Sequence, residues 1–376
     1  MGPTTSLLLS PVTSPEESLC THTPVSGKSI HQVGKVFLRM VSLKSKKTTG
    51  RIHGQSATQI SVVIPASSRP QLLRNCIQCL VGQSFDKNFY EIIVVSDGFD
   101  DATKNIVNEF KQYHAALYYL YLPVKRGSAA TRNLGWQRAW GKLIAFTEDY
   151  CLPDKDWLSF LYKIYKGEEV IAYSGTVKVP LPTNPADHEE KISNLETSEF
   201  VTANCCCSKV ALEKVGGFDE RFTMAWREDS DLEFKLIRQH IPVIKVKEAL
   251  VLRPPRQVSW DSSIKEQKKG IFNALLYKKF PDLYRKKILI NRPWNYYMIA
   301  VAFVCTVLSF VLSVQRLALV FILCWAALTV NVAMTRLRTT RALNHVAEMA
   351  LTSILVPFVS VYWQLYGAIK YRTFFL

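Results

Sequence analysis

Short apolar runs alternate with segments of helical periodicity from about residue 59 to about residue 240. Five of the apolar runs are typical of buried strands, and in most of the segments between them apolar residues recur every three or four positions. This alternation predicts an α/β fold with a mostly parallel sheet and flanking helices. The expected strands lie within 60–68, 91–101, 117–122, 143–151 and 171–179, and the expected helices within 70–83, 102–113, 128–140, 210–215 and 230–238.

Two long uncharged runs near the C-terminus, 296–314 and 317–334, have a different pattern. Each is close to the length that crosses about 30 Å of hydrocarbon. Only Gln315 and Arg316 separate them, which predicts a tight transmembrane hairpin. A weaker third candidate, 346–369, either spans the bilayer or lies in its interface, since it contains Glu, Pro and Gln residues.

The pattern divides the chain into four parts. Residues 1–58 are rich in Ser, Thr and Pro and lack a hydrophobic period, which predicts a disordered basic extension. Three alternatives for it stay open, namely a transit peptide, a membrane-contacting basic patch and a true start at Met40. The α/β domain is expected at 59–257, a basic amphipathic membrane-proximal connector at 258–293 and the transmembrane region at 294–376.

The net charge of +16 raises the question of nucleic acid, but the position of the basic residues argues against it. Basic clusters flank the two uncharged runs, and the positive-inside rule places both clusters on the cytoplasmic face. There they face anionic lipid head groups. We therefore expect an integral membrane protein with its α/β domain on the cytoplasmic face and no nucleic-acid partner. The first cluster comprises Lys265, Lys268, Lys269, Lys278, Lys279, Arg285, Lys286, Lys287 and Arg292, and the second Arg336, Arg338 and Arg341.

The nine cysteines have the pattern of neither a disulfide framework nor a zinc site. Residues 205–207 are three adjacent cysteines, and the CxxC pair at Cys76 and Cys79 has no second pair and no histidines nearby. We expect small buried side chains in a reducing compartment.

Acidic residues follow several of the predicted strands. The run 91–101 (EIIVVSDGFDD) ends in carboxylates, 143–151 (LIAFTEDYC) carries an acid pair, and 227–232 (REDSDL) holds three acids. The carboxyl ends of parallel strands meet at one edge, where open α/β sheets bind ligands. The order and spacing of these segments resemble glycosyltransferase family 2 over about half of the chain. The resemblance implies a Rossmann-like GT-A fold and transfer of a sugar from a nucleotide diphosphate sugar donor.

The resemblance assigns donor binding to the turn after the first strand and the acid after the second. The family often has two Asp after that second strand, where this chain has Ser96–Asp97, so the base that it recognises stays open. The segment 125–136 (KRGSAATRNLGW) resembles the family's glycine–arginine–asparagine segment, and its arginine can pair with phosphate through a bidentate fork. The predicted donor-binding residues are Pro65, Ala66, Ser67, Asp97, Arg132, Asn133, Glu148 and Asp149.

The resemblance also implies a divalent cation, held by an acid cluster after the strand at 143–146. Such a cation, Mg²⁺ or Mn²⁺, acts as a Lewis acid toward the leaving diphosphate. The aligned residues are Glu148, Asp149 and Tyr150, and Tyr150 stands where the family's last Asp is the usual ligand. The predicted metal ligands are therefore Glu148 and Asp149, with a site that relies on cationic side chains as the alternative.

The segment 227–232 resembles the acidic acceptor-site motif of the family. In an adjacent acid pair, like-charge repulsion raises the pKa of one member, which suits a base working near neutral pH. We predict Asp229 as the catalytic base and Glu228 as the residue that orients the acceptor. The segment 201–219 resembles the family as well, and the predicted acceptor-binding residues are Asn204, Trp226 and Asp231.

Processive synthases of this family carry a glutamine–x–x–arginine–tryptophan motif, and the nearest string here, 256–260 (RQVSW), lacks its arginine. We therefore predict single transfer to a hydroxyl of a lipid-linked or membrane-associated acceptor, with the inversion that the family implies. Two alternatives stay open. One is the catalytic subunit of a small polysaccharide synthase. The other is a catalytically dead membrane scaffold of the same fold, which Ser96 and Tyr150 favour and the intact segment 227–232 opposes.

Overall fold

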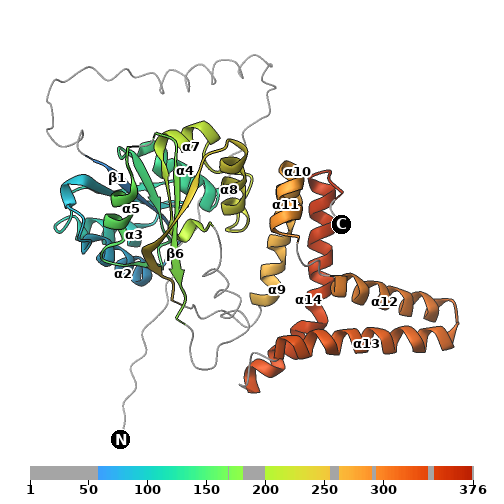
Figure 1. Cartoon of the computed structure of the whole chain (residues 1–376). Helices are drawn as coiled ribbons and strands as arrows, with labels where there is room; N and C mark the ends of the chain where they lie inside the picture. The colour runs from blue at the N-terminus through green and yellow to red at the C-terminus, as the bar shows by residue number, and fades with distance from the viewer. Residues whose placement is uncertain are drawn as a thin grey trace, which may run out of the picture. The chain divides into compact units, whose positions relative to one another are not determined.

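A computed structural model describes residues 58–167, 169–180, 200–254, 262–289, 294–337 and 343–374 (Figure 1). Within these ranges the strands all lie before Pro254, and only helices follow. The predicted disorder of residues 1–58 falls outside the described residues, except for Thr58, and stays a prediction.

One eight-stranded sheet organises the α/β part. Its strands span Ile60–Ala66 (β1), Tyr90–Ser96 (β2), Leu117–Tyr121 (β3), Leu143–Phe146 (β4), Leu152–Pro153 (β5), Ala172–Lys178 (β6), Cys205–Ser208 (β7) and Val243–Leu252 (β8), in the order β3-β2-β1-β4-β7-β6-β8-β5. The first four strands are parallel, as predicted. β7 runs antiparallel to both β4 and β6, and β8 is parallel to β6 and therefore to β4. The expected α/β class is confirmed, with a mixed sheet.

Side chains of the central strands alternate between two apolar layers. Val62 and Ile64 of β1 lie in one layer and Val63 lies in the other, and all three are fully buried. Because helices cover both faces, these strands are almost continuous apolar runs. The first layer includes side chains of α2 (Pro70–Val81), α3 (Asp101–Phe110) and α5 (Trp157–Ile164), and the second those of α4 (Ser128–Arg138), α7 (Lys209–Val215) and α8 (Glu228–Arg238).

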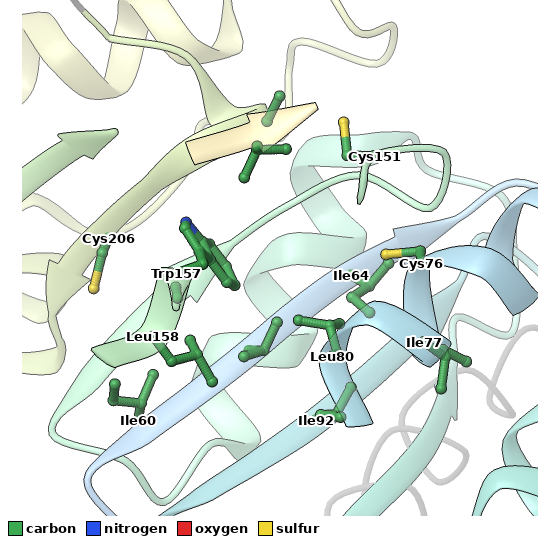
Figure 2. Packing of buried hydrophobic residues seen from close by; sticks show 14 of the residues in the cluster. Ile60, Ile64, Cys76, Ile77, Leu80, Ile92, Cys151, Trp157, Leu158 and Cys206 are labelled. Atoms are coloured by element: carbon green, nitrogen blue, oxygen red, sulfur yellow. The ribbon is translucent and has the colours of Figure 1, made fainter. Parts of the chain in front are cut away.

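The first layer contains Cys76 of the CxxC segment and Trp157 of α5 (Figure 2). Cys76, Leu80 and Trp157 are completely buried there, together with Cys206 of β7. Burial raises the pKa of the Cys76 thiol well above its usual value, so the group stays neutral and unreactive. The cysteines in the described part of the chain are free, and the predicted burial is wrong for Cys324, which is exposed on α13 (Gln315–Leu337).

Four strands and helices of the α/β part were missed in the sequence: β5, α5, β7 and β8. β7 is the triple cysteine, which lies fully buried between β4 and β6. β8 has its buried residues at Val246, Ala249 and Val251, because an irregularity in its pairing with β6 between Gly175 and Thr176 breaks the period of two. Its exposed lysines and glutamate further hide the strand pattern.

Helices form the rest of the described chain. The connector consists of α9 (Ser262–Glu266), α10 (Ile271–Lys279) and α11 (Pro281–Lys287), and an apolar cluster joins it to Phe222 and Phe234 of the α/β part. α12 (Trp294–Val311), α13 (Gln315–Leu337) and α14 (Leu343–Lys370) follow. Each holds a segment long and apolar enough to cross a membrane, namely Trp294–Val311, Gln315–Arg336 and Met349–Lys370.

The third apolar helix is more enclosed by protein than the other two. In the apolar segment of α14, 39% of the residues are buried by protein, whereas the share is 17% in α12 and in α13. The share is larger because α14 also packs on the connector. A Cβ on Gly367 would lie 2.8 Å from the Ile271 carbonyl oxygen, and Lys278 Nζ donates to the Tyr371 carbonyl at 2.7 Å. The structure thus ties the C-terminal end of α14 to α10.

Candidate active site

The predicted donor turn and the predicted acid pair meet at the carboxyl edge of the sheet. β1 ends in the buried residues Pro65 and Ala66, and Ser67 follows directly. Because β4 is parallel to β1 and pairs with it, the segment after β4 lies beside this turn. The Ser67 N–H donates to Asp149 Oδ2 at 2.9 Å, although the two residues are 82 positions apart.

Asp149 is completely buried and has both carboxylate oxygens engaged. Arg69 Nε donates to Oδ2 at 3.2 Å, and Arg69 Nη2 donates to Oδ1, which together make a bidentate fork. Burial raises the pKa of Asp149, while Arg69 and the Ser67 N–H oppose that rise. Arg69 was not among the predicted residues, although it stands directly before the helix that follows β1.

Arg132 joins the two acidic motifs. Its guanidinium is completely buried, and it donates to Glu148 and, at 3.2 Å, to Glu228 Oε1. Glu148 follows β4 and belongs to the segment predicted to bind a metal. Glu228 begins α8 and belongs to the predicted acceptor motif. Arg132 of α4 therefore holds these two segments together. Ser128 Oγ donates to the same Glu228 oxygen at 3.2 Å. A buried guanidinium with two carboxylate partners avoids the large penalty of an unpaired charge.

Asp229 stands at the N-terminal turn of α8, where the helix dipole favours negative charge. The turn before it is tight, since Arg227 has a left-handed φ of 72°. Asp229 Oδ1 accepts the Ser230 N–H at 2.7 Å, and the side chain is half-buried. Within the described residues Asp229 has no ion-pair partner, in contrast to Glu228 beside it.

Burial gives Glu228 an unusual titration. Loss of hydration raises its pKa to about 7, and the charge of Asp229 adds to the rise, while Arg132 opposes it. The folded protein therefore keeps Glu228 protonated up to a higher pH than the unfolded chain does. Folding stability then falls as the pH rises from the usual glutamate pKa toward 7.

Glu228→Gln removes this pH dependence. We expect the melting temperature of the variant, relative to the native chain, to rise as the pH goes from 5 to 8. At pH 8 the gain in the free energy of unfolding of the variant, relative to the native chain, is at most about 2–3 kcal/mol. Thermal unfolding of both proteins across this range measures it, and a melting difference that does not change with pH contradicts the assignment.

Asp97 organises the loop before α4. Its carboxylate accepts the Arg126 N–H at 2.7 Å and the Gly127 N–H at 3.0 Å. Gly127 has a φ of 90°, and a Cβ there would lie 2.2 Å from the Thr223 carbonyl oxygen, so only glycine fits. The predicted acid after β2 is thus linked to the helix that carries Arg132. Its contact with the nucleotide stays a prediction.

Two predicted binding asparagines are buried within the framework. Asn133 Oδ1 accepts the Phe218 N–H at 2.9 Å, which fixes the turn before α8. Asn204 accepts from Trp157 Nε1 at 2.8 Å and donates to the Thr176 carbonyl at 2.8 Å. Both side chains therefore position the walls of the site. The predicted direct contacts with donor or acceptor stay predictions.

The other predicted acceptor residues lie on either side of the start of α8. Trp226 is 40% exposed, and its Nε1 donates to Asn273 Oδ1 of α10 at 3.3 Å. An exposed indole beside an acid pair suits an apolar or sugar ligand. Asp231 is completely buried and forms ion pairs with Lys279 and, at 3.2 Å, with Lys235. Both carboxylate oxygens of Asp231 thus lie within ion-pair distance of a lysine, and its contact with the acceptor stays a prediction.

Lys279, the last residue of α10 in the connector, joins this helix to α8. It pairs with Asp231 and, at 2.7 Å, with Asp219, and its side chain is 18% exposed. Lys279→Met removes the cation that the two carboxylates share and leaves Asp231 with Lys235 and Asp219 with Arg221. We expect the free energy of unfolding to fall by about 2–3 kcal/mol. Chemical denaturation of the detergent-solubilised variant measures this loss, with Lys286→Met as the control because Lys286 is exposed. Equal losses in the two variants contradict the role of Lys279.

The predicted cation ligands do not fit a metal ion in this arrangement. Asp149 has both oxygens bound to N–H groups, and Glu148 pairs with Arg132. Within the described parts of the chain, no group of three or more His, Cys, Asp or Glu side chains is placed to hold a metal. The cation that the resemblance implies therefore stays a prediction, and we derive no step through it.

Comparison with known proteins agrees with this geometry. Residues 61–215 match the profile described as Glycosyl transferase family 2. Residues 61–215 thus form a domain of this family. The resemblance noted in the sequence and the GT-A fold class that it implied are therefore confirmed.

Relatives of the family 2 domain include glycosyltransferase AglE of Haloferax volcanii, 27% identical over 168 residues, or 42% of this chain and 55% of the relative. Chondroitin synthase of Escherichia coli is 24% identical over 270 residues, which are 61% of this chain and 39% of the synthase. The chain thus spans about half of the first relative and less of the second.

The fold of the family 2 domain also has a solved counterpart. A mannosyltransferase of Pyrobaculum calidifontis, solved with GDP-Man and Mn²⁺, has a TM-score of 0.50 at 15% identity, over 90% of this chain and 94% of its own. This likeness shows a shared fold, in which that protein holds a nucleotide sugar and a divalent cation.

Proposed function

We propose that this chain is an inverting glycosyltransferase that moves a sugar from a nucleotide diphosphate sugar to an acceptor hydroxyl. The observation that carries the proposal is the Arg132 bridge, which gathers Glu148 and Glu228 beside Asp229 at the carboxyl edge of the sheet. Family membership and the mannosyltransferase fold support the same reaction class.

Asp229 is the base in this proposal. Its carboxylate is half-buried and has no cation partner in the described part of the chain, so it is able to accept a proton. As it takes the proton of the acceptor hydroxyl, the acceptor oxygen bonds to the anomeric carbon. The bond from that carbon to the diphosphate oxygen breaks on the opposite face, and the nucleoside diphosphate leaves.

Arg132 and Glu228 position the reacting groups. Arg132 is buried with two acids, so it fixes the start of α8 relative to the end of β4. Glu228 shares Arg132 with Glu148, and burial raises its pKa to about 7. Such fixed geometry is a large part of enzymatic rate enhancement.

We infer an acceptor that is lipid-linked or otherwise held at the membrane. Three helices are apolar enough to span a bilayer, and the basic connector contacts α8 directly through Lys279. The exposed Trp226, bound to Asn273 of the connector, lies beside Asp229 in the sequence. The positive-inside rule, applied to the basic clusters, supports a catalytic domain on the cytoplasmic face.

Transfer into lipid tests the proposal. Detergent-solubilised protein is incubated with isotope-labelled nucleotide sugars and a membrane lipid extract. We expect label in the organic phase, and NMR of the product should show the anomeric configuration opposite to that of the donor. Label that stays in water-soluble products rejects the lipid acceptor, and retained configuration rejects inversion.

A further inference from the structure

Tyr150 lies between two basic loops at the edge of the sheet. Its ring is buried, and the guanidinium carbon of Arg69 lies 4.7 Å from the ring centroid. The guanidinium carbon of Arg253 lies 5.1 Å from the same centroid. Guanidinium groups stack on aromatic rings and keep their N–H edges available for hydrogen bonds.

The three residues come from the ends of three strands that point the same way. Arg69 follows β1, Tyr150 follows β4, and Arg253 directly follows β8. β8 is parallel to β6, and β6 and β4 are both antiparallel to β7, so all three strands end at one edge. This is the edge that also holds Asp149, where open α/β sheets bind their ligands.

Within the described residues, the cluster has a positive charge that no carboxylate pairs with. Asp149 compensates Arg69, whereas Arg253 has no carboxylate within ion-pair distance among the described residues. Both arginines are half-buried, so a ligand can reach them. A partly buried guanidinium without a counter-ion is a strong site for an anion.

Tyrosine at position 150 is compatible with this charge. An aspartate there would place a carboxylate among the two guanidinium groups and cancel the excess. The aromatic ring instead orients both groups without neutralising them. The residue that departs from the family pattern therefore favours an anion over a cation at this point.

We propose that Arg253, oriented together with Arg69 by Tyr150, binds the diphosphate of the donor directly. The inference rests on the proposed function, since the diphosphate is that of the nucleotide sugar. The Arg253 guanidinium takes the charge-compensating role that the family gives to a metal. In the ligand-bound state Arg253 donates to diphosphate oxygens, while Arg69 keeps Asp149 in place.

Nucleotide affinity tests this inference without measuring transfer. The affinities of UDP, GDP, uridine and guanosine are measured by calorimetry in EDTA and again with Mn²⁺. We expect Arg253→Gln to weaken nucleoside diphosphate binding about 10- to 100-fold in EDTA and to leave nucleoside binding unchanged. Arg253→Lys keeps the charge and loses the bidentate fork. Its diphosphate affinity should lie between those of the native chain and Arg253→Gln.

Arg238→Gln is the matched control, because Arg238 lies away from this edge of the sheet. Its guanidinium carbon stacks on Phe280, 4.6 Å from the ring centroid. Tyr150→Asp should also weaken diphosphate binding in EDTA, since the new carboxylate neutralises Arg253. Diphosphate affinity that is equal in the native chain and Arg253→Gln overturns the inference and leaves the proposed function standing. A native chain that binds none of the four ligands under either condition overturns both.

Discussion

Arg132→Met should lower the free energy of unfolding by about 3–5 kcal/mol. The native guanidinium is completely buried and pairs with Glu148 and Glu228, which lie on segments far apart in sequence. Without it, two buried or nearly buried carboxylates face each other with no cation between them. Chemical denaturation of the native chain and the variant measures the difference.

Two further variants separate the ion bridge from general damage. Arg138→Met, on the exposed side of the same helix, should cost less than about 0.5 kcal/mol. Adding Glu148→Gln and Glu228→Gln to Arg132→Met should recover part of the loss, because uncharged amides need no counter-ion. If the triple variant is no more stable than the single one, the loss comes from packing and the bridge is not the cause.

Asp229→Asn should lower the turnover number by about 10²–10⁴-fold, which is the usual contribution of a general base. The substitution keeps the shape of the side chain and its place at the helix start, so donor binding should change little. The expected signature is therefore a reduced kcat at nearly constant donor affinity, measured by steady-state transfer together with calorimetry.

Asp282→Asn is the control for this variant, since Asp282 is an exposed aspartate in the first turn of α11. It should retain native turnover. A turnover number of Asp229→Asn within about threefold of the native value rules out Asp229 as the base. A loss of donor affinity that matches the loss of turnover would instead assign Asp229 to binding.

The parallel core could be predicted because its strands are buried on both faces. Runs such as 60–66 and 90–96 are apolar throughout, and acids that follow them must lie at one edge of a parallel sheet. The sequence therefore located Asp149 and Ser67 near each other, as the structure has them. The same reasoning missed β8, whose pairing irregularity removes the alternation on which strand prediction depends.

The charge pairing within the site could not be predicted. Arg132 and Glu228 are 96 residues apart, and no local pattern shows that they share a hydrogen bond. In the sequence, Lys279 is likewise one of many basic residues before the apolar segments. In the structure it is the ion-pair partner of the buried Asp231. Which acids are engaged and which are available to a substrate depends on the three-dimensional packing of α4, α8 and α10.

This difference changes the interpretation of the acid pair after β4. In the sequence, Glu148 and Asp149 are two hard oxygen ligands, whereas in the structure both belong to ion pairs with arginine. The signal that was present in the sequence is Tyr150, which replaces an expected acid. Arg253 gave no signal, because it follows a strand that the pattern did not reveal.

Release of nucleoside diphosphate from a panel of UDP-, GDP- and dTDP-sugars tests the central claim most directly. The native protein in detergent, supplied with membrane lipid extract, is compared with Asp229→Asn under the same conditions. We expect release from a specific donor by the native protein and loss of that release in the variant. Equal release by both proteins, or none from any donor by well-folded native protein, contradicts it.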